Sequence, residues 1–467
     1  MTSSEFPTTL AGLSLSDSSH NPSLYDSLKS IRKSTLSIPN RLNSILKDTE
    51  FVKEVCRYHG LPLVANERCG SWYIDPAEKA GSTYFKSTDG HHGQWDFSPR
   101  RLNLQLLPIL AMHGGAILVD STRRGKNLPD AFGKTVPIWV AVVNRALFPE
   151  VTSMHHFQSP PSPYDIPSSE ISQIEARLDG FTQTFCRLGL DLQSLRSQLG
   201  SPIRVSWAIN GPVDGEYDLG DDDGRAASSR AVHQPCHHIV LCSASRRVRG
   251  AEISEGGYIQ GAGDDSEGWS HNLTAQLFWQ HRDLLMETSE DELPALIKKL
   301  VAQDEGSRLS GTAATRVIPT TTMSIAIGPL ESLDGFDLII NCQGGTQNST
   351  PKVVYLKCRS GKLGSKDLRD NLSVAVSAVR DKLCRHPESQ ILITCATGKD
   401  LSAGVAVAAL CLLYDDQGQL RATTERPPVD KQLVKQRLAW ITSSKADANP
   451  SRATLQAVHS FLIQRPE

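Results

Sequence analysis

One segment near the C-terminus constrains the fold more than any other part of the sequence. The apolar run 391–394 leads into a short polar loop, 395–401, and a long apolar run, 403–414, follows it. A short apolar run bounded by turn residues is typical of a buried strand, and the longer run suits a buried helix. The segment therefore predicts a strand, a loop and a helix in succession, with backbone N–H groups gathered into a cradle for an anion.

The rest of the last 145 or so residues repeats this alternation. Strands are expected at 338–341, 353–356 and 391–394, and helices at 366–384, 402–414 and 431–440. Strands that alternate with helices indicate an α/β unit with a mostly parallel sheet flanked by helices. The polar, irregular stretch 303–320 predicts a boundary, so we expect a separate C-terminal domain over residues 320–467.

The N-terminal part of the chain has a less regular pattern. We expect helices at 25–59 with a break at Pro39, at 101–113, at 171–199 and at 273–285, strands at 115–120, 203–209 and 239–242, and loops at 81–95, 121–126 and 158–169. These elements predict an α+β domain over residues 25–310. Residues 1–24 are rich in Ser, Thr and Pro, which is typical of a disordered tail.

Composition limits the kinds of protein that this chain can be. A length of 467 residues suggests two or three domains. Ten cysteines without a CxxC pair indicate reduced thiols in a cytosolic protein, and we expect neither a secretory signal nor a membrane-spanning segment. The net charge of −2 does not by itself indicate a nucleic-acid partner.

Basic residues are nevertheless concentrated in two stretches. Residues 100–134 contain six Lys or Arg against two acidic residues, and residues 352–385 contain nine against three. Such patches can neutralise the phosphates of a nucleic acid, although most charged stretches are only solvated surface.

The loop after residue 394 resembles the phosphate-binding loop of dual-specificity and tyrosine phosphatases. That family has Cys, five residues and then Arg; here Cys395 fits, but Leu401 stands at the Arg position and Thr394 replaces the preceding His. Without Arg the clamp on a phosphoryl transition state is missing, and the thiolate is less favoured. The nearest candidate for a general acid is Asp367. We therefore expect a phosphatase-like domain that binds phosphate without phosphatase catalysis; the alternative is a buried structural cysteine.

Two segments of the N-terminal part also carry candidate chemistry. The strand that ends at Asp120 is followed by Ser, Thr, Gly and basic residues up to Lys126, which could hold a phosphorylated sugar and its metal. Adjacent carboxylates at Asp264 and Asp265, after two glycines, suit Mg²⁺ or a general base. A solvated basic loop and an acidic turn are the alternatives.

Several longer strings, in register along both halves of the chain, resemble the initiator tRNA 2′-O-ribosyl phosphate transferases of fungi and plants. These strings are 82–91 with Trp95, 101–104, 119–126, 134–139, 258–265, 361–368 and 395–402. The resemblance extends from about residue 25 to near the end of the chain.

The resemblance implies a reaction. Enzymes of this family transfer a 5-phosphoribosyl group from 5-phosphoribosyl 1-diphosphate to the 2′-OH of adenosine 64, in the T stem of cytoplasmic initiator methionine tRNA. Diphosphate is released, and the mark excludes this tRNA from elongation. Mg²⁺ would neutralise the departing diphosphate, and a carboxylate would take the proton of the 2′-OH. A catalytically inactive module that binds phosphorylated partners or RNA is the alternative.

Candidate residues follow for each role. The catalytic candidates are Asp120, Asp264, Asp265 and Asp89, of which the first three are also the candidate metal ligands. The candidates for binding donor phosphates are Ser121, Thr122, Arg123, Arg124, Lys126, Cys395, Ala396, Thr397, Gly398, Lys399, Asp400, Leu401 and Ser402. The candidates for binding tRNA are His91, His92, Arg100, Arg101, Lys134, Lys357, Arg359, Lys362 and Lys366. We expect a cytoplasmic enzyme with no obligate protein partner.

Overall fold

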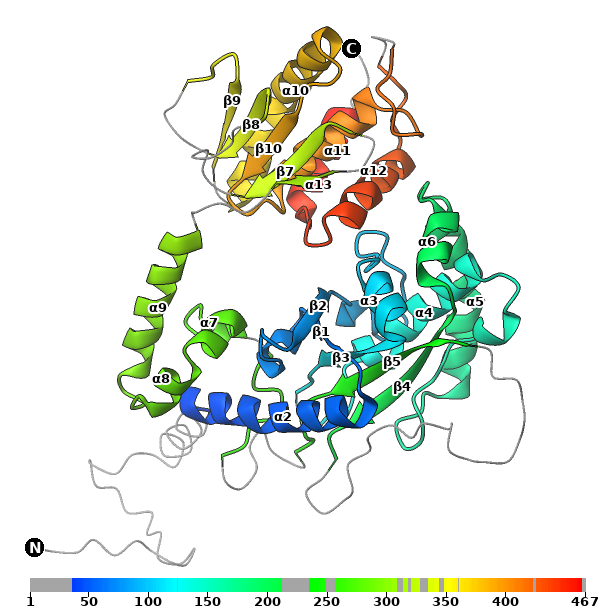
Figure 1. Cartoon of the computed structure of the whole chain (residues 1–467), viewed down its shortest axis with the longest axis vertical. Helices are drawn as coiled ribbons and strands as arrows, with labels where there is room; N and C mark the ends of the chain where they lie inside the picture. The colour runs from blue at the N-terminus through cyan, green and yellow to red at the C-terminus, as the bar shows by residue number, and fades with distance from the viewer. Residues whose placement is uncertain are drawn as a thin grey trace, which may run out of the picture.

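The computed structural model describes residues 36–123, 125–211, 235–248, 257–264, 266–308, 314–317, 321–327, 335–343, 348–359, 361–422 and 426–463. The predicted tail 1–24, Arg124, Asp265 and the side chain of Lys362 lie outside this description. The described residues form two sheets, each with its own helices, and Figure 1 shows one unit above the other.

The first sheet lies in the N-terminal domain and is parallel throughout. Its strands are β1 (Leu63–Asn66), β2 (Lys79–Thr83), β3 (Gly115–Asp120), β4 (Ile203–Ile209) and β5 (His237–Ser243), in the order β2-β1-β3-β5-β4. The helices are α2 (Ile38–His59), α3 (Leu106–His113), α4 (Val136–Leu147), α5 (Ser168–Cys186), α6 (Leu192–Leu199), α7 (Ala275–Gln280), α8 (Arg282–Glu287) and α9 (Leu293–Arg308). Parallel pairing places this domain in the α/β class, where we expected an α+β arrangement.

Helices cover both faces of this sheet. Ala116 and Leu118 of β3 pack into one core with α3 to α6, whereas Ile117 and Val119 pack into a second core with α2 and α7 to α9. Successive side chains of a strand point to opposite faces, so one apolar strand supplies both cores. Such a three-layer arrangement leaves the ends of the strands as the place for a ligand.

Several helix boundaries differ from the sequence predictions. Pro39 does not break a helix but begins one, because proline fits the first turn and Ser37 caps it through a hydrogen bond from the Asn40 N–H to the Ser37 hydroxyl (3.4 Å). The helix predicted at 171–199 is two helices, separated near Gly189, which has a φ of +68°. The helix predicted at 273–285 is also two, and the one predicted at 101–113 begins only at Leu106. The predicted loop 81–95 includes the end of β2.

The second sheet forms the C-terminal domain and is mostly parallel, as predicted. Its strands are β6 (Thr315–Arg316), β7 (Met323–Ile327), β8 (Leu338–Gln343), β9 (Val353–Cys358) and β10 (Ile391–Cys395), in the order β6-β7-β10-β8-β9, and only β6 is antiparallel to its neighbour. Its helices are α10 (Gly361–Arg385), α11 (Leu401–Leu413), α12 (Lys431–Ser444) and α13 (Arg452–Leu462). The strands β6 and β7 and the helix α13 were not predicted.

The two domains contact each other through α12 and the segment before α13. Ala439 of α12 belongs to the core of the N-terminal domain, and the Trp440 indole N–H donates to the carbonyl of Gly189 (3.3 Å). Arg100 and Arg101 donate to the Pro450 carbonyl (2.6 Å) and the Asn449 side chain (3.4 Å). No described helix is long and apolar enough to cross a membrane.

Candidate active site

The candidate site lies where the strand order of the first sheet reverses. From β1 the chain reaches β2 on one side, whereas β3 lies on the other side of β1. In open parallel sheets ligands bind outside the carboxyl ends of the strands at such a point. β1 ends at Asn66 and β3 ends at Asp120, so the loops after these two strands meet there.

Asp120 is the buried centre of this edge. Its side chain is 0% exposed, and its Oδ2 accepts hydrogen bonds from Asn66 (2.8 Å) and from Arg68 Nε (3.2 Å). Its Oδ1 accepts from Arg68 Nη2 (2.9 Å), from the Cys69 thiol (3.0 Å) and from the backbone N–H of Ser121 (2.8 Å). These donors fill both oxygens, so Asp120 acts as an anchor that joins the two loops.

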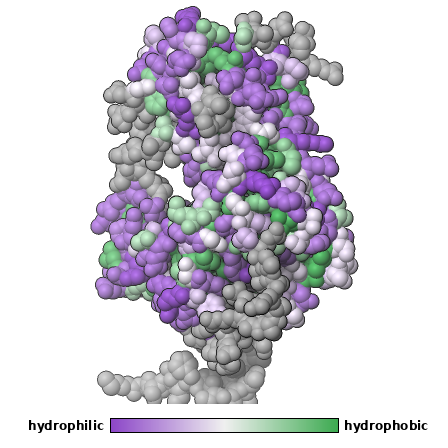
Figure 2. Space-filling view, turned by 45° about the vertical axis from the view of Figure 1, so that its right-hand side comes forward, coloured by the Kyte–Doolittle hydropathy of each residue, from purple (hydrophilic) through white to green (hydrophobic). Residues whose placement is uncertain are grey.

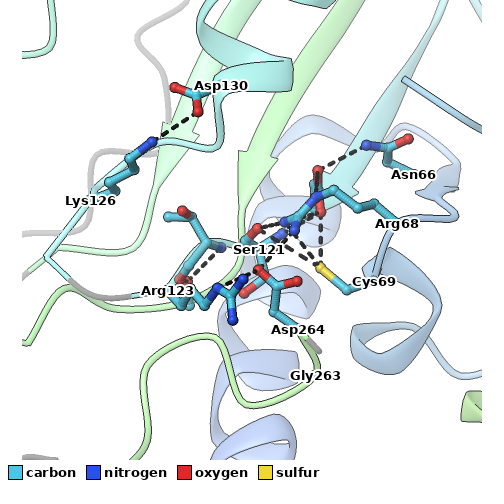
Figure 3. A network of polar contacts seen from close by, with 12 residues as sticks. Asn66, Arg68, Cys69, Ser121, Arg123, Lys126, Asp130, Gly263 and Asp264 are labelled. Carbon is cyan, nitrogen blue, oxygen red and sulfur yellow. Dashed lines mark hydrogen bonds and ion pairs between the residues drawn. The ribbon is translucent and has the colours of Figure 1, made fainter. Parts of the chain in front are cut away.

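Arg68 bridges Asp120 to the other predicted carboxylate, Asp264. Its Nη1 lies 2.8 Å from Asp264 Oδ2, and Arg123 Nε lies 3.8 Å from the same oxygen. Figure 3 shows Arg68 pointing toward Cys69, Ser121 and Asp264. Burial by itself lowers the pKa of Arg68, but the neighbouring Cys69, Asp120 and Asp264 raise it above its ordinary value. The arginine therefore stays charged between the two carboxylates.

The segment that carries Asp264 is held close to the loop after β3. Gly261 has a φ of +65°, and a Cβ there would lie 2.7 Å from the Thr122 carbonyl oxygen, so only glycine fits. The N–H of Gly263 donates to the Tyr73 hydroxyl (2.9 Å). From below, Ser44 of α2 accepts from the Ile259 N–H (2.9 Å), and Asp48 accepts from the Tyr258 hydroxyl (2.7 Å). These contacts from α2 thus hold the segment before Asp264 in place beside the edge of the sheet.

The predicted loop 121–126 surrounds the same edge. The N–H of Thr122 donates to Ser245 (3.1 Å), and the N–H of Gly125 donates to Gln260 (3.0 Å). Lys126 forms an ion pair with Asp130 (2.8 Å), and Arg123 is 55% exposed. Among the described residues of this loop, Arg123 is the basic side chain that is both exposed to solvent and close to Asp264.

Asp89 lies in a separate small pocket beside Asp96, Phe97 and Trp139. Burial raises the pKa of Asp89, and the carboxylate of Asp96 adds to this effect. The structure therefore does not place Asp89 with the carboxylates at the ends of β1 and β3.

The second predicted phosphate site, the loop 395–402, lies between β10 and α11. Burial alone would raise the pKa of Cys395, but hydrogen bonds from the Ser402 hydroxyl (3.1 Å) and from backbone groups of Ser402 and Thr397 lower it below its ordinary value. The loop thus favours a negative charge even without an arginine. Asp400 points away to α13, where it accepts from the Ser451 N–H (2.8 Å) and the Thr454 hydroxyl (2.6 Å).

The features that a phosphatase needs are otherwise missing from this loop. Leu401 packs against the apolar core of the domain. Arg359 donates to both oxygens of Asp367 (2.9 and 2.7 Å) and holds the pKa of that carboxyl well below its usual range. A carboxyl group that stays ionised cannot serve as a general acid at neutral pH.

A cavity of about 850 Å³ separates the two domains beside the candidate site. It is lined from the N-terminal domain by Glu67, Lys79, Tyr84, Arg100 and Arg101, and from the C-terminal domain by Lys399 and the segment 446–449. Figure 2 shows the molecule hollowed between its upper and lower halves. None of the described residues in the loop 121–126 lines this cavity, so the described part of that loop does not share a pocket with the loop 395–402.

The residues predicted to bind tRNA fall into three groups. His91 contacts Asp130, whereas His92 and Lys134 contact Glu170, with Lys134 only 15% exposed. Arg100 and Arg101 line the interdomain cavity, and Arg101 stacks on Tyr84 at 3.7 Å from the ring centre. Lys357 lies on β9, Arg359 directly after β9, and Lys366 on α10; Figure 1 shows these two elements on the side away from the N-terminal domain.

The comparisons with known proteins cover both domains. The family model described as the Rit1 N-terminal domain matches residues 31–302, and the one described as the Rit1 DUSP-like domain matches residues 352–462. An uncharacterized protein of Schizosaccharomyces pombe is 34% identical over an alignment of 462 positions, with 94% of this chain and 97% of that protein covered. The tRNA A64-2′-O-ribosylphosphate transferase of Saccharomyces cerevisiae is 33% identical over 492 residues, with 93% of this chain and 94% of that protein covered.

Among solved structures, human DUSP28 aligns with 32% of this chain and 95% of its own length, at 17% identity and a TM-score of 0.24. The second family model describes a phosphatase-like domain at the position where the sequence predicted one. Since one family model matches more than half of the chain and the yeast transferase matches nearly all of it, this protein belongs to the Rit1 family.

Proposed function

We propose that this protein transfers a 5-phosphoribosyl group from 5-phosphoribosyl 1-diphosphate to the 2′-OH of adenosine 64 in initiator methionine tRNA. The observation that carries the proposal is the similarity, over both domains, to a yeast protein named as a transferase that acts on A64 of tRNA. The carboxylates and arginines at the edge of the first sheet supply groups that such a transfer needs.

The donor binds at the edge formed by the ends of β1 and β3. Arg123, exposed and next to Asp264, meets its phosphate groups. Mg²⁺ enters as the counter-ion of the donor diphosphate and is part of that substrate. The loop 395–402 remains a second candidate for a phosphate group.

Asp264 is the base in this proposal. Its side chain is 11% exposed, whereas Asp120 is fully enclosed by its donors. The 2′-oxygen of the acceptor bonds to C1 of the donor ribose as the bond from C1 to the diphosphate breaks. The proton of the 2′-OH passes to Asp264, and the electron pair of the broken bond leaves with the diphosphate.

The acceptor RNA lies across the interdomain cavity. Arg100, Arg101 and Lys399 supply positive charge from both domains, and the cavity borders Glu67, the neighbour of Arg68 in the chain. A duplex stem is contacted mainly through its phosphates and 2′-hydroxyl groups, which suits a cavity with basic walls. Since the acceptor is a cytoplasmic tRNA, we place the protein in the cytoplasm; all ten cysteines are free thiols, which is consistent with a reducing compartment.

A transfer assay tests the proposal directly. Purified protein is mixed with unmodified initiator tRNA, Mg²⁺ and donor labelled in its 5-phosphate. We expect label in the initiator tRNA, but not in an elongator tRNA or in an initiator tRNA with a 2′-deoxy residue at position 64. The Asp264→Asn variant should lose the activity, whereas Asp283→Asn, which changes a 78%-exposed carboxylate on α8, should keep it.

Two negative outcomes separate the alternatives. Donor binding without transfer would point to another acceptor. If the protein neither binds the donor nor transfers the label, the proposal is overturned. That result would favour a phosphatase-like module that binds phosphorylated partners or RNA.

A further inference from the structure

We propose that Arg68 occupies the place of a metal ion in this site, so that Asp120 and Asp264 are held together by a guanidinium group and not by a divalent cation. The sequence predicted these two carboxylates as magnesium ligands. The inference concerns the cation between them, and it goes beyond the proposed reaction because cation binding can be measured without donor or tRNA.

The oxygens of Asp120 have no room for a metal. A carboxylate offers about four lone-pair positions. Five donors from Asn66, Arg68, Cys69 and Ser121 already approach the two oxygens of Asp120 at 2.8 to 3.2 Å. A magnesium ion requires oxygen ligands at about 2.0–2.1 Å in an octahedral arrangement. Binding it at Asp120 would break several of these hydrogen bonds.

Arg68 meets the requirement of the two carboxylates for positive charge. Its Nε and Nη2 donate to the two oxygens of Asp120, while its Nη1 lies 2.8 Å from Asp264 Oδ2. A planar guanidinium with five donors in a fixed fork can serve two carboxylates at once, which a lysine cannot do in the same geometry. The Arg68 side chain is 18% exposed, so solvent weakens these ion pairs little.

The described residues around this pair supply no alternative set of ligands. Within the described part of the chain, no three His, Cys, Asp or Glu side chains come together as a metal centre would need. The next cation beside Asp264 is again an arginine, Arg123. Asp264 therefore stands between two guanidinium groups, and its position depends on Arg68 as a positioning residue.

Binding of Mn²⁺, followed by electron paramagnetic resonance in the absence of donor and tRNA, tests this inference. We expect that Asp264→Asn leaves Mn²⁺ binding by the otherwise unchanged protein unaltered. In Arg68→Ala the two carboxylates lose their cation, and we expect this variant to gain about one bound Mn²⁺ per chain. The double variant Arg68→Ala with Asp264→Asn should lose that ion again.

Arg68→Lys serves as the matched control, because it keeps a positive charge and should gain no Mn²⁺ site. Loss of a Mn²⁺ ion from the unchanged protein on Asp264→Asn would overturn the inference. So would a folded Arg68→Ala variant that binds no additional ion. If Arg68→Ala does not fold, the comparison of the unchanged protein with Asp264→Asn decides alone. None of these readings depends on transfer activity, so they are distinct from a failure of the proposed function.

Discussion

Asp120 and Asp264 share one arginine but differ in their surroundings. Asp120 is fully buried and holds the loops after β1 and β3, whereas Asp264 reaches solvent at the edge of the sheet. Two carboxylates that the sequence treated alike therefore have different parts in the site. One is a structural anchor, and the other is the carboxylate that we propose to contact a substrate.

This difference predicts losses of stability of different size when each carboxylate is replaced. Asp120→Asn puts an amide among five donors and leaves Arg68 without its buried partner, so we expect a loss of about 3 kcal/mol in the free energy of unfolding. Asp264→Asn weakens the pairs with Arg68 and Arg123 but leaves Arg68 paired with Asp120, so it should cost clearly less. Urea denaturation of the two variants checks this, and equal losses would contradict the anchoring role of Asp120.

Asp120 could be predicted from the sequence, but its partner Arg68 could not. Asp120 could be predicted because an apolar strand ends at it and a basic loop follows. Arg68 follows a strand of only four residues and stands outside every motif that we recognised. Its role depends on β1 pairing with β3, which brings together positions more than 50 residues apart, and no local pattern records that pairing.

At the scale of elements, the strands that were predicted have bounds close to those of the structure, but β1 and β2 and the helices α4 and α9 were not predicted. The strands β3 and β4 have the predicted bounds, because both are apolar runs with polar residues at their ends. The helix predicted at 171–199 is interrupted near Gly189, whose φ is +68°, and the one predicted at 273–285 is interrupted at His281. The two-residue strand β6 lies in the polar stretch 303–320 that we interpreted as a boundary, and the short strand β7 follows soon after it.

The close approach of the segment 261–264 to the loop after β3 predicts an effect at Gly261. In Gly261→Ala the new Cβ meets the Thr122 carbonyl and the positive φ becomes strained, so we expect a loss of about 2 kcal/mol in stability together with reduced transfer. Gly268→Ala is the matched control, because a Cβ there meets nothing within 4 Å. Thermal unfolding and the transfer assay compare the two; similar behaviour would mean that the segment moves freely.

The contact of α2 with the same segment predicts a dependence on pH. Burial raises the pKa of Asp48 well above its ordinary value of about 4, so the folded state favours the protonated acid. This contribution to stability is complete below about pH 4 and is lost as the pH rises toward the raised folded pKa, by about 1.4 kcal/mol per unit. Asp48→Asn cannot ionise and still accepts from Tyr258, so its advantage over the unchanged protein should grow with pH.

Free energies of unfolding measured from pH 4 to pH 8 check this prediction. Asp283→Asn on the exposed side of α8 is the control and should follow the unchanged protein. A constant difference between Asp48→Asn and the unchanged protein at every pH would show that Asp48 does not keep its proton on folding.

At the scale of the whole molecule, the basic residues offer two surfaces for RNA. One is the interdomain cavity with Arg101, and the other is formed by β9 and α10 on the far side of the C-terminal domain. If RNA crosses the cavity, Arg101→Gln should weaken tRNA binding and lower the slope of its salt dependence by about one. Lys357→Gln should leave both unchanged. Binding followed by fluorescence anisotropy at several salt concentrations decides, and the reverse result would move the RNA to β9 and α10.

The order of the strands in the first sheet also determines when the site can be completed during synthesis. β4 leaves the ribosome before β5, yet β5 is the strand that pairs with both β3 and β4. Until residue 243 has been synthesised, β4 has no strand to pair with, and β3 lacks its neighbour on one side. These unpaired strand edges can pair with other chains. Asp264, the second partner of Arg68, is synthesised later still. A translational pause between β4 and β5 would therefore leave both the edge of β3 and the whole of β4 unpaired, which favours aggregation.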